Sequence, residues 1–415
     1  MTTPGSLLTL TVDRPAVGGA MIARVEGRIV LVSGAIPGER VTARVDRTSK
    51  GVAFATTVSV DEASSDRRPG FADPLCGGCA YSHIAYDRQR AIKAQVVADA
   101  FARIARVELP AVVDVRPSPE TGYRMRARLH ARGGRLGFFR EGTHGVCDPR
   151  QSRQLLDDSC DALDRVAAAM RSLGDTVREV ELSENMPASE RVVHLETARP
   201  VDSRALDALK SVAGLTPSPY VSDDVTIGDR SIRLRRHVLA FFQGNRYLLR
   251  ELVEYVVNLV EPGSEVLDLY AGAGLFSVAM ASFRSASVTA VEGDRYASDD
   301  LRANCAAAGG DLTAIRSDVE SAVVALRNRG PRETSAPTDR VVVVDPPRTG
   351  LSPDARDGVI QLAPRRIVYV SCDVATLARD SRAIVDAGYS IERVKAFDLF
   401  PNTPHVETVV TYSRR

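Results

Sequence analysis

The chain has 415 residues, 44 % of them hydrophobic, and this length exceeds one ordinary core, so we expect two or three domains. No apolar run approaches the ~18 residues of a membrane span. The N-terminus, MTTPGSLLTL, lacks the pattern of a secretory signal, and six cysteines do not make a disulfide scaffold. We therefore expect a cytoplasmic protein with no membrane partner. The net charge of +1 is small for a protein that binds polyanions, so a nucleic-acid surface would require an uneven distribution of charge.

Residues 1–62 predict a small β-barrel. The segments LLTLTVDRP, GGAMIARVEGRIVLVSG and ERVTARVDRTSKGVAFATTVSV have the pattern of several short strands separated by Gly and Pro. The polar stretch DEASSDRRPG that follows is typical of a linker.

Residues 63–235 are expected to form a central α+β domain with a basic hairpin. Between residues 116 and 153, nine arginines stand against three acids, a local excess of +6. The alternation in GYRMRARLHARGGRLGFFR has the period of a strand, which predicts that Arg124, Arg126 and Arg128 share one face. That face is a candidate track for RNA. The alternative is a solvated edge strand defended by charge.

The segment SEVLDLYAGAGLFSVAMA predicts a nucleotide-binding turn. A buried strand over residues 265–270 is followed by Gly272 and Gly274, and a helix is expected from about Leu275. Glycines let the backbone approach a ligand where a Cβ would collide. Because Ser277 stands where a dinucleotide fingerprint has its third glycine, S-adenosylmethionine is favoured over a dinucleotide.

Three acids follow the next predicted strands. Glu292 ends a strand where it can bind the two hydroxyls of a ribose, and Asp318 is placed to accept the adenine amino group. Asp345 lies at the tip of the apolar run in VVVVDPPRTG, where the prolines fix the backbone. A carboxylate there is suited to holding a planar base by its edge, and the alternative is a helix cap or turn residue.

Cys372 and Glu407 have the chemistry needed to methylate carbon 5 of a pyrimidine. Cys372 follows an apolar strand in IVYVSCDVATLARD, and Glu407 ends DLFPNTPHVE 35 residues later. Carbon 5 is a poor nucleophile until a thiolate adds to carbon 6, and a base must then remove the proton left on carbon 5. We expect Cys372 to be the nucleophile and Glu407 the base. The alternative is a buried structural thiol and an acid on a solvated edge.

The C-terminal half resembles the RNA 5-methyluridine methyltransferases of the TrmA/RumA type. The likeness rests on FFQGNRYLLRELV, VLDLYAGAG, VVVVDPPRTG, IVYVSCDVATLARD and DLFPNTPHVETVV, which occur in this order. It implies an α/β Rossmann-like, S-adenosylmethionine-dependent methyltransferase domain over residues 236–415, with Cys372 as nucleophile and Glu407 as base. The implied contacts to S-adenosylmethionine are Gln243, Tyr270, Gly272, Gly274, Glu292, Asp318 and Asp345.

The resemblance also places Asp345 and Arg348 near the target base and the methyl donor. His405 is given a supporting role at most, in orienting the carboxylate or the backbone, and Asn245 belongs to a turn before a helix. Leu275 stands where some members of the family carry Asn, which puts one hydrogen bond to the cofactor in doubt.

The first 60 or so residues resemble a TRAM domain, an OB-like RNA-binding module. Together with the family's GYRxRAR pattern, this favours RNA, either ribosomal or transfer, as the partner. A barrel at the front of the chain leans toward ribosomal RNA. No DNA partner is expected, and we expect a monomer.

The motif CGGC, with Cys76 and Cys79, resembles part of an iron–sulfur signature. In relatives that carry a 4Fe-4S cluster, two further cysteines stand where this chain has Gly70 and Ser152, and neither residue supplies a thiolate readily. We therefore expect a remnant of the motif rather than an intact cluster, with no bound metal.

Other states of these cysteines stay open. Cys147 or Cys160 lies close enough in sequence to substitute as a cluster ligand after a local shift. The motif could also be a reduced, buried C-x-x-C, a disulfide between its own two cysteines, or a zinc site completed by His83 or Cys147.

Two alternative functions compete with 5-methyluridine formation. Enzymes that form 5-methylcytosine also use thiol addition, but they usually place a second cysteine after the proline of the motif that here reads Asp345-Pro346-Pro347. The other alternative is a non-catalytic RNA-binding protein that kept the barrel. The set of Gln243, Asp345, Cys372 and Glu407 argues against it.

Overall fold

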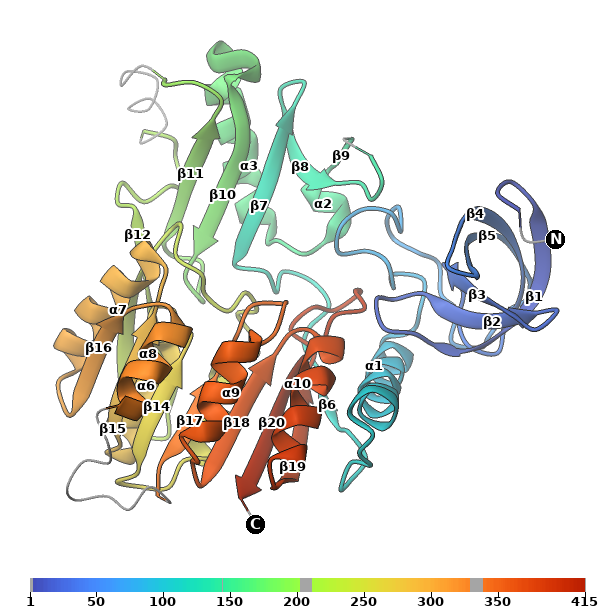
Figure 1. Ribbon diagram of the computed structural model, residues 1–415. Coiled ribbons are helices and arrows are strands. Elements are labelled where there is room, and N and C mark those ends of the chain that lie inside the picture. Colours follow the sequence, from blue (N-terminus) through green and yellow to red (C-terminus); the bar gives the residue numbers. More distant parts are fainter. Residues whose placement is uncertain (1–2, 144, 202–210, 329–338, 415) are drawn as a thin grey trace.

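The computed structural model describes residues 3–143, 145–201, 211–328 and 339–414. Three units follow one another along the chain, and Figure 1 shows the N-terminal barrel at one side of the two larger ones. In the part of the chain that is described, no helix has the length and apolar character needed to cross a membrane.

The N-terminal unit is a closed five-stranded barrel, as the pattern of short strands predicts. Its strands run in the order β1-β2-β3-β5-β4, with β3 and β5 parallel and the other pairs antiparallel. They are β1 (Leu7–Pro15), β2 (Met21–Val25), β3 (Arg28–Ser33), β4 (Arg40–Ser49) and β5 (Val52–Glu62). Closure leaves the barrel with no bare edge.

The central unit is built on an antiparallel sheet with the order β11-β10-β7-β8-β9. Its strands are β7 (Arg126–Arg132), β8 (Arg135–Phe139), β9 (Val146–Cys147), β10 (Val177–Glu184) and β11 (Arg191–Thr197). The short helix α2 (Pro149–Ser152) precedes α3 (Asp157–Ala169), which continues into a 3-10 segment, Met170–Thr176. One apolar cluster joins α3 to this sheet through Leu163, Val166, Leu129 and Val180.

The C-terminal unit is an eight-stranded sheet with the order β16-β15-β14-β17-β18-β20-β19-β6. Five strands are parallel, namely β14 (Glu265–Leu269), β15 (Ser287–Glu292), β16 (Leu312–Arg316), β17 (Val341–Val344) and β18 (Arg366–Ser371). β20 (Glu407–Arg414) is antiparallel to both β18 and β19 (Tyr389–Phe397). The apolar run of β17 is buried on both faces, as expected for a central parallel strand.

Helices cover both faces of this sheet. They are α5 (Leu249–Asn258), α6 (Leu275–Arg284), α7 (Arg295–Ala308), α8 (Val319–Asn328), α9 (Pro353–Gln361) and α10 (Val374–Asp386). α6 begins at Leu275, where the sequence predicts a helix start. The hairpin β12 (Tyr220–Ile227) and β13 (Arg230–His237) packs its apolar side into the same core as α5 and α6.

Two elements from the first third of the chain also belong to this sheet. β6 (Val115–Arg116) pairs with β19 and forms the last strand. α1 (Tyr86–Ala100) runs into a π-helical turn, Phe101–Ala105, whose apolar residues share a core with α10 and β18. The C-terminal sheet is therefore completed by residues far from it in sequence.

The parallel strands end at the edge of the sheet that faces the central unit (Figure 1). β14 and β17 are neighbours, while β15 and β16 extend away on one side and β18 lies on the other. The strand order reverses at this point, and ligands of open α/β sheets bind beyond the carboxyl ends there.

Candidate active site

A cavity of about 690 Å³ lies between the carboxyl edge of the large sheet and β7 of the central sheet. Most of the residues singled out from sequence line it. They are Gln243, Tyr270, Gly272, Glu292, Asp345, Arg348, Cys372 and Glu407, with Arg124, Arg126 and Arg128 on the opposite side. The structure thus brings together residues that are spread over almost 300 positions.

Cys372 lies in the short turn between β18 and α10. β18 ends at Ser371, and Asp373 caps α10 by accepting a hydrogen bond from the N–H of Thr376 at 2.9 Å. Burial raises the pKa of the Cys372 thiol to about 12, and the charges of Glu407 and Asp345 act in the same direction. The neighbouring Arg348 opposes this rise. Without a substrate, the thiol is therefore protonated at neutral pH.

Glu407 opens β20, directly across from Cys372. Ser371 of β18 pairs with Thr408 of β20, so the next position on each strand faces its counterpart at the end of the ladder. Glu407 is 2 % exposed. Burial raises the pKa of its carboxyl well above the usual value, Asp345 adds to the rise and Arg348 opposes it. A buried carboxyl of raised pKa is suited to accept a proton near neutral pH.

Asp345 follows β17 and accepts a hydrogen bond from Nε2 of Gln243 at 3.1 Å. Burial and the nearby Asp268 raise the pKa of Asp345 to about 7, and the Gln243 amide opposes the rise. Both side chains line the same cavity as Cys372. An acceptor and an amide side by side can pair with the edge of a nucleobase.

Glu292 ends β15 and is fixed by two backbone N–H groups. Its Oε2 accepts from Gly272 at 2.8 Å, and its Oε1 accepts from Asp294 at 2.7 Å. Each carboxylate oxygen keeps a further lone pair for an incoming hydroxyl. Gly272 has a φ of 57°, and Tyr270, two residues earlier, has a left-handed φ of 62°; both residues of this turn after β14 line the cavity. This donor and acceptor set fits the ribose of S-adenosylmethionine.

Two predicted cofactor residues do not line the cavity. Gly274 has a φ of 93°, and a Cβ there would lie 2.9 Å from Leu301, so its role in the structure is close packing of the turn on α7. Asp318 accepts a hydrogen bond from the N–H of Ser321 at 2.7 Å and so caps α8. Their contacts to a cofactor stay predictions.

Arg124, two residues before β7, and Arg126 and Arg128 of β7 all line the cavity, but they are not a free basic stripe. Arg124 donates to Oε1 of Gln154 at 2.6 Å, and Arg128 is paired with Glu181. Arg126 packs its guanidinium over the ring of Phe241, 5.7 Å from the centroid, and burial lowers its pKa to about 10. Arg128, whose side chain is 63 % exposed, is the best placed to reach RNA.

Sequence reasoning missed Phe241, which lines the cavity, and Asp268, whose charge acts on Asp345. Phe241 is 63 % exposed at the cavity wall, two positions before Gln243. Asp268 is fully buried inside β14, where burial raises its pKa to about 7, and it accepts a hydrogen bond from Ser277. An acid within an otherwise apolar strand was the available signal for Asp268, whereas nothing in the FFQGN motif marked which Phe is exposed.

Asn245 has a larger structural role than the expected turn. Its Oδ1 accepts from the N–H groups of Tyr247 and Leu248 in the turn just before α5, and its Nδ2 donates to the carbonyl of Leu399 at 3.1 Å. His405 is partly buried, which together with nearby Arg348 lowers its pKa to about 4 and keeps it neutral. The expectation that His405 orients Glu407 stays a prediction.

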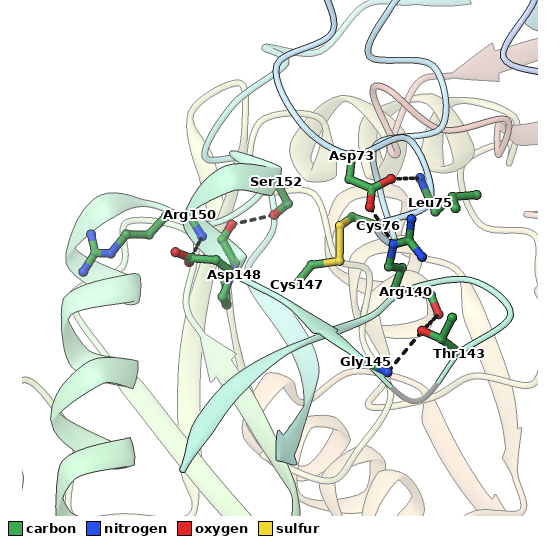
Figure 2. Close-up of a disulfide and its surroundings, with 12 residues drawn as sticks. Asp73, Leu75, Cys76, Arg140, Thr143, Gly145, Cys147, Asp148, Arg150 and Ser152 are labelled. Atoms are coloured by element: carbon green, nitrogen blue, oxygen red, sulfur yellow. Dashed lines mark hydrogen bonds and ion pairs between the residues drawn. A yellow bond between two sulfur atoms is a disulfide. The ribbon is translucent and has the colours of Figure 1, made fainter. Parts of the chain in front are cut away.

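The cysteines of the central region are paired differently from every state considered from the sequence. Cys76 forms a disulfide with Cys147 of β9, with 6.0 Å between the Cα atoms, and Figure 2 shows this bond joining two segments. Cys76 and Cys79 lie in one tight turn, in which the N–H of Cys79 donates to the carbonyl of Cys76. Cys147 of β9, and not Cys79, lies next to Cys76 and is bonded to it. The predicted alternative of a disulfide between Cys76 and Cys79 is therefore wrong.

A four-cysteine cluster does not fit these residues. Cys76 is bonded to Cys147, and Ser152 uses its hydroxyl to donate to the carbonyl of Pro149 at 2.6 Å (Figure 2). Gly70 lies beside Ser82 and offers no ligand atom. Burial raises the pKa of the remaining thiol, Cys79, to about 11. Within the described ranges, no group of three or more His, Cys, Asp or Glu side chains is arranged to hold a metal ion, His83 included.

Comparison with known proteins agrees with this geometry. Residues 215–415 match the family described as tRNA (Uracil-5-)-methyltransferase, and residues 2–58 match the TRAM domain. A 23S rRNA (uracil(1939)-C(5))-methyltransferase RlmD from Halomonas elongata is 32 % identical over 97 % of this chain and 88 % of its own length. An uncharacterized RNA methyltransferase from Thermotoga maritima is 31 % identical, covering 95 % of this chain and 96 % of that protein.

The chain belongs to the family of RNA uracil-C5-methyltransferases.

Membership in this family confirms the predicted enzyme class, the methyl donor S-adenosylmethionine and RNA as the partner. The barrel is confirmed as a TRAM domain. The fold also agrees with the crystal structure of a tRNA (uracil-54, C5)-methyltransferase from Pyrococcus abyssi, which has a TM-score of 0.72, 24 % identity and coverage of 97 % of this chain and 99 % of that one.

Proposed function

We propose that this enzyme methylates carbon 5 of a uridine in large-subunit ribosomal RNA, through a covalent bond between Cys372 and the uracil ring. The observation that carries this proposal is the facing pair of Cys372 and Glu407 at one end of the β18–β20 ladder, inside a cavity that also holds Asp345 and Gln243. The TRAM barrel and the RlmD relatives support a ribosomal substrate. We place the enzyme in the cytoplasm as a monomer.

The target uridine turns out of its stack and enters the cavity, because a base inside a helix cannot expose both faces. Asp345 and Gln243 hold its polar edge, and the carboxylate of Asp345 accepts from the N3–H of uracil. Recognition of this N–H separates uridine from cytidine, whose N3 is an acceptor. Arg124, Arg126 and Arg128 line the path that the RNA backbone follows into the cavity.

The thiol of Cys372 gives its proton to solvent water, its sulfur bonds to carbon 6, and the electrons of the C5–C6 double bond shift toward carbon 5 and the O4 carbonyl. Carbon 5 takes the methyl group from S-adenosylmethionine, which leaves as S-adenosylhomocysteine. Glu407 removes the remaining proton from carbon 5, the double bond re-forms, and the C6–S bond breaks to return the thiolate. Arg348 beside Cys372 favours the thiolate at both ends of this sequence.

The turn around Glu292 and Gly272 holds the ribose of S-adenosylmethionine, with Tyr270 and Gln243 nearby in the same cavity. This places the cofactor between the ends of β14 and β15 and the uracil next to the ends of β17 and β18.

Mass mapping of 5-methyluridine in ribosomal and transfer RNA, from cells with and without this protein, tests the proposal. We expect one 5-methyluridine to be lost from large-subunit ribosomal RNA and restored by the wild-type gene. Loss from transfer RNA alone would reassign the substrate. Loss of 5-methylcytosine, or no change in either pool, would contradict the proposed reaction.

A further inference from the structure

The loop between β19 and β20, residues 398–406, leads directly into Glu407. Its residues Leu399 and Phe400 line the cavity, so one side of the loop faces the substrate. Its other side is held by segments that lie about 300 positions earlier in the chain. The placement of Glu407 therefore depends on what holds this loop.

Asn402 is one point at which the loop is held. It is 1 % exposed and has a φ of 63°. Its Oδ1 accepts hydrogen bonds from Arg68 and Gln89, each at 2.9 Å, and its own N–H donates to Oε1 of Gln89 at 2.9 Å. The carbonyl of Asn402 accepts from the N–H of Tyr81 at 2.8 Å. The linker and α1 thus fix the middle of the loop.

Lys93 and Asp398 fix its beginning. Lys93 of α1 is 1 % exposed, and its Nζ lies 2.5 Å from Oδ1 of Asp398 and 3.0 Å from the carbonyl oxygen of Phe400. Separating a buried ion pair leaves uncompensated charge in the interior, so this contact resists movement.

The barrel touches the loop just before the base. Gly19 lies in the turn between β1 and β2, and a Cβ added to it would lie 2.8 Å from Cγ of Pro404. The backbone of the barrel turn is therefore packed directly on Pro404, three residues before Glu407. Because the start and middle of the loop are fixed, a displacement of Pro404 is passed on to residues 405–407 rather than absorbed upstream.

We propose that the barrel is a positioning element for the catalytic base: its turn at Gly19 packs on Pro404 and holds Glu407 in place to remove the proton from carbon 5. This inference rests on the proposed function, in which Glu407 is that base. It gives the barrel a part in the second half of the reaction in addition to RNA binding. The step affected is transfer of the carbon 5 proton to Glu407, with re-formation of the C5–C6 double bond and release of the Cys372 sulfur.

Two neighbouring glycines provide a matched test. Gly18 and Gly19 have φ values of 89° and 97°, so alanine strains the backbone similarly at both positions. Only at Gly19 does the added Cβ meet Pro404, because at Gly18 nothing lies within 4 Å. A comparison of Gly19→Ala with Gly18→Ala therefore isolates the push on the loop from the strain in the turn.

The measurement is the amount of covalent protein–RNA adduct on a denaturing gel during turnover, together with KM for S-adenosylmethionine. We expect Gly19→Ala to resolve the methylated adduct about tenfold more slowly than Gly18→Ala, within the range that small displacements of a catalytic group produce. KM for S-adenosylmethionine should be the same in both. Equal adduct levels in the two variants would overturn the inference.

Asn402 gives a second test that leaves the barrel unchanged. Asn402→Gly tolerates the left-handed φ but removes the oxygen that Arg68 and Gln89 share, whereas Asn402→Asp keeps an oxygen there. We expect adduct to accumulate in Asn402→Gly and not in Asn402→Asp. Equal adduct levels in these two would show that the held loop does not place the base.

The reference variant Glu407→Gln distinguishes failure of the proposed base from failure of the proposed role of the barrel. If Glu407→Gln accumulates no adduct, the base assignment itself fails. If Glu407→Gln accumulates adduct while Gly19→Ala matches Gly18→Ala, only the role of the barrel fails.

Discussion

Cys372 and Glu407 lie opposite each other at the end of an antiparallel ladder, one position beyond the paired residues Ser371 and Thr408. β18 and β20 are neighbours in the sheet although 35 residues separate the two side chains. A shift of either strand by one residue would point one of the two side chains to the other face of the sheet. The register of this one strand pair therefore brings the proposed nucleophile and base together.

Replacing Cys372 by alanine tests the nucleophile. We expect Cys372→Ala to reduce turnover by at least about a thousandfold, because carbon 5 is not activated without thiol addition. Binding of S-adenosylmethionine, measured by calorimetry, should be nearly unchanged, because the turn at Glu292 is untouched. Cys305→Ala, which removes a buried thiol of α7 outside the cavity lining, is the control. A fully active Cys372→Ala would exclude this chemistry.

Replacing Glu407 by glutamine tests the base. Glutamine keeps the shape of the side chain but cannot accept the carbon 5 proton, so we expect the methylated adduct to persist. A band that withstands denaturing electrophoresis, with mass spectrometry showing both RNA and the added methyl group, is the readout. Release of product at the wild-type rate would remove Glu407 from this role.

The raised pKa of Cys372, about 12, predicts how the free enzyme reacts with iodoacetamide. Below the pKa, the thiolate fraction rises tenfold with each pH unit, so alkylation should accelerate steadily from about pH 7 to 10 without a plateau. Glu407→Gln should speed it by removing a negative charge, and Arg348→Met should slow it. Mass spectrometry of the peptide that contains Cys372 gives the rate. A plateau below pH 9 would contradict the raised pKa.

Arg128 tests the RNA path on β7. We expect Arg128→Ala to weaken RNA binding at all sequences and to reduce the dependence of log affinity on log salt by about one unit, as for loss of a phosphate contact. Arg382→Ala is the control, because Arg382 lies on α10, outside the cavity lining, and is paired with Asp386. Filter binding over a range of salt concentrations measures both. Equal slopes in the two variants would show that Arg128 makes no phosphate contact. The alternative of an edge strand defended by charge is wrong, because β7 lies between β10 and β8 in its sheet.

The disulfide between Cys76 and Cys147 closes a loop of 71 residues. Chain entropy alone makes such a crosslink worth up to about 4 kcal/mol of unfolding free energy. We expect reductant to lower the unfolding free energy of the wild type and of Cys79→Ser but not that of Cys147→Ser. Denaturant titrations measure this. Peptide mapping that paired Cys76 with Cys79 would contradict it.

The same residues predict the iron content. Because Cys76 and Cys147 are bonded to each other, and the described residues contain no group of three or more His, Cys, Asp or Glu arranged to hold a metal ion, protein purified without oxygen should contain no iron. Elemental analysis showing about four irons per chain, with a visible absorbance band, would overturn this.

Much of the C-terminal half could be predicted from sequence because local patterns and global position agree there. The buried strand, the glycine turn and the helix start at Leu275 follow from propensity, and the carboxyl-edge rule for parallel sheets then gathers Glu292, Asp345 and Cys372. Glu407 was found through chemistry and resemblance. Its register opposite Cys372 is a tertiary fact that no local pattern contains.

Prediction from the sequence failed where the interaction partner of a residue lies far away along the chain. Cys147 lies 71 positions from Cys76, and the pairing depends on β9 returning alongside the turn that carries Cys76. The alternation of residues along β7 predicts which way Arg128 points. It does not predict that acids on β10 neutralise the charge of Arg128. The hydrogen bond from Arg68 to Asn402 joins residues more than 300 positions apart, so no local pattern predicts it either.

α1 and β6 complete the large sheet from the first third of the chain. β6 covers the outer strand β19, and the apolar face of α1 and the turn after it fills a core shared with α10. A fragment made of residues 236–415 alone would leave that strand edge unpaired and that core open to water, two features that promote aggregation. The catalytic domain expected from sequence, residues 236–415, is therefore not a unit that folds independently. Fusing it to another RNA-binding domain would also require residues 86–116.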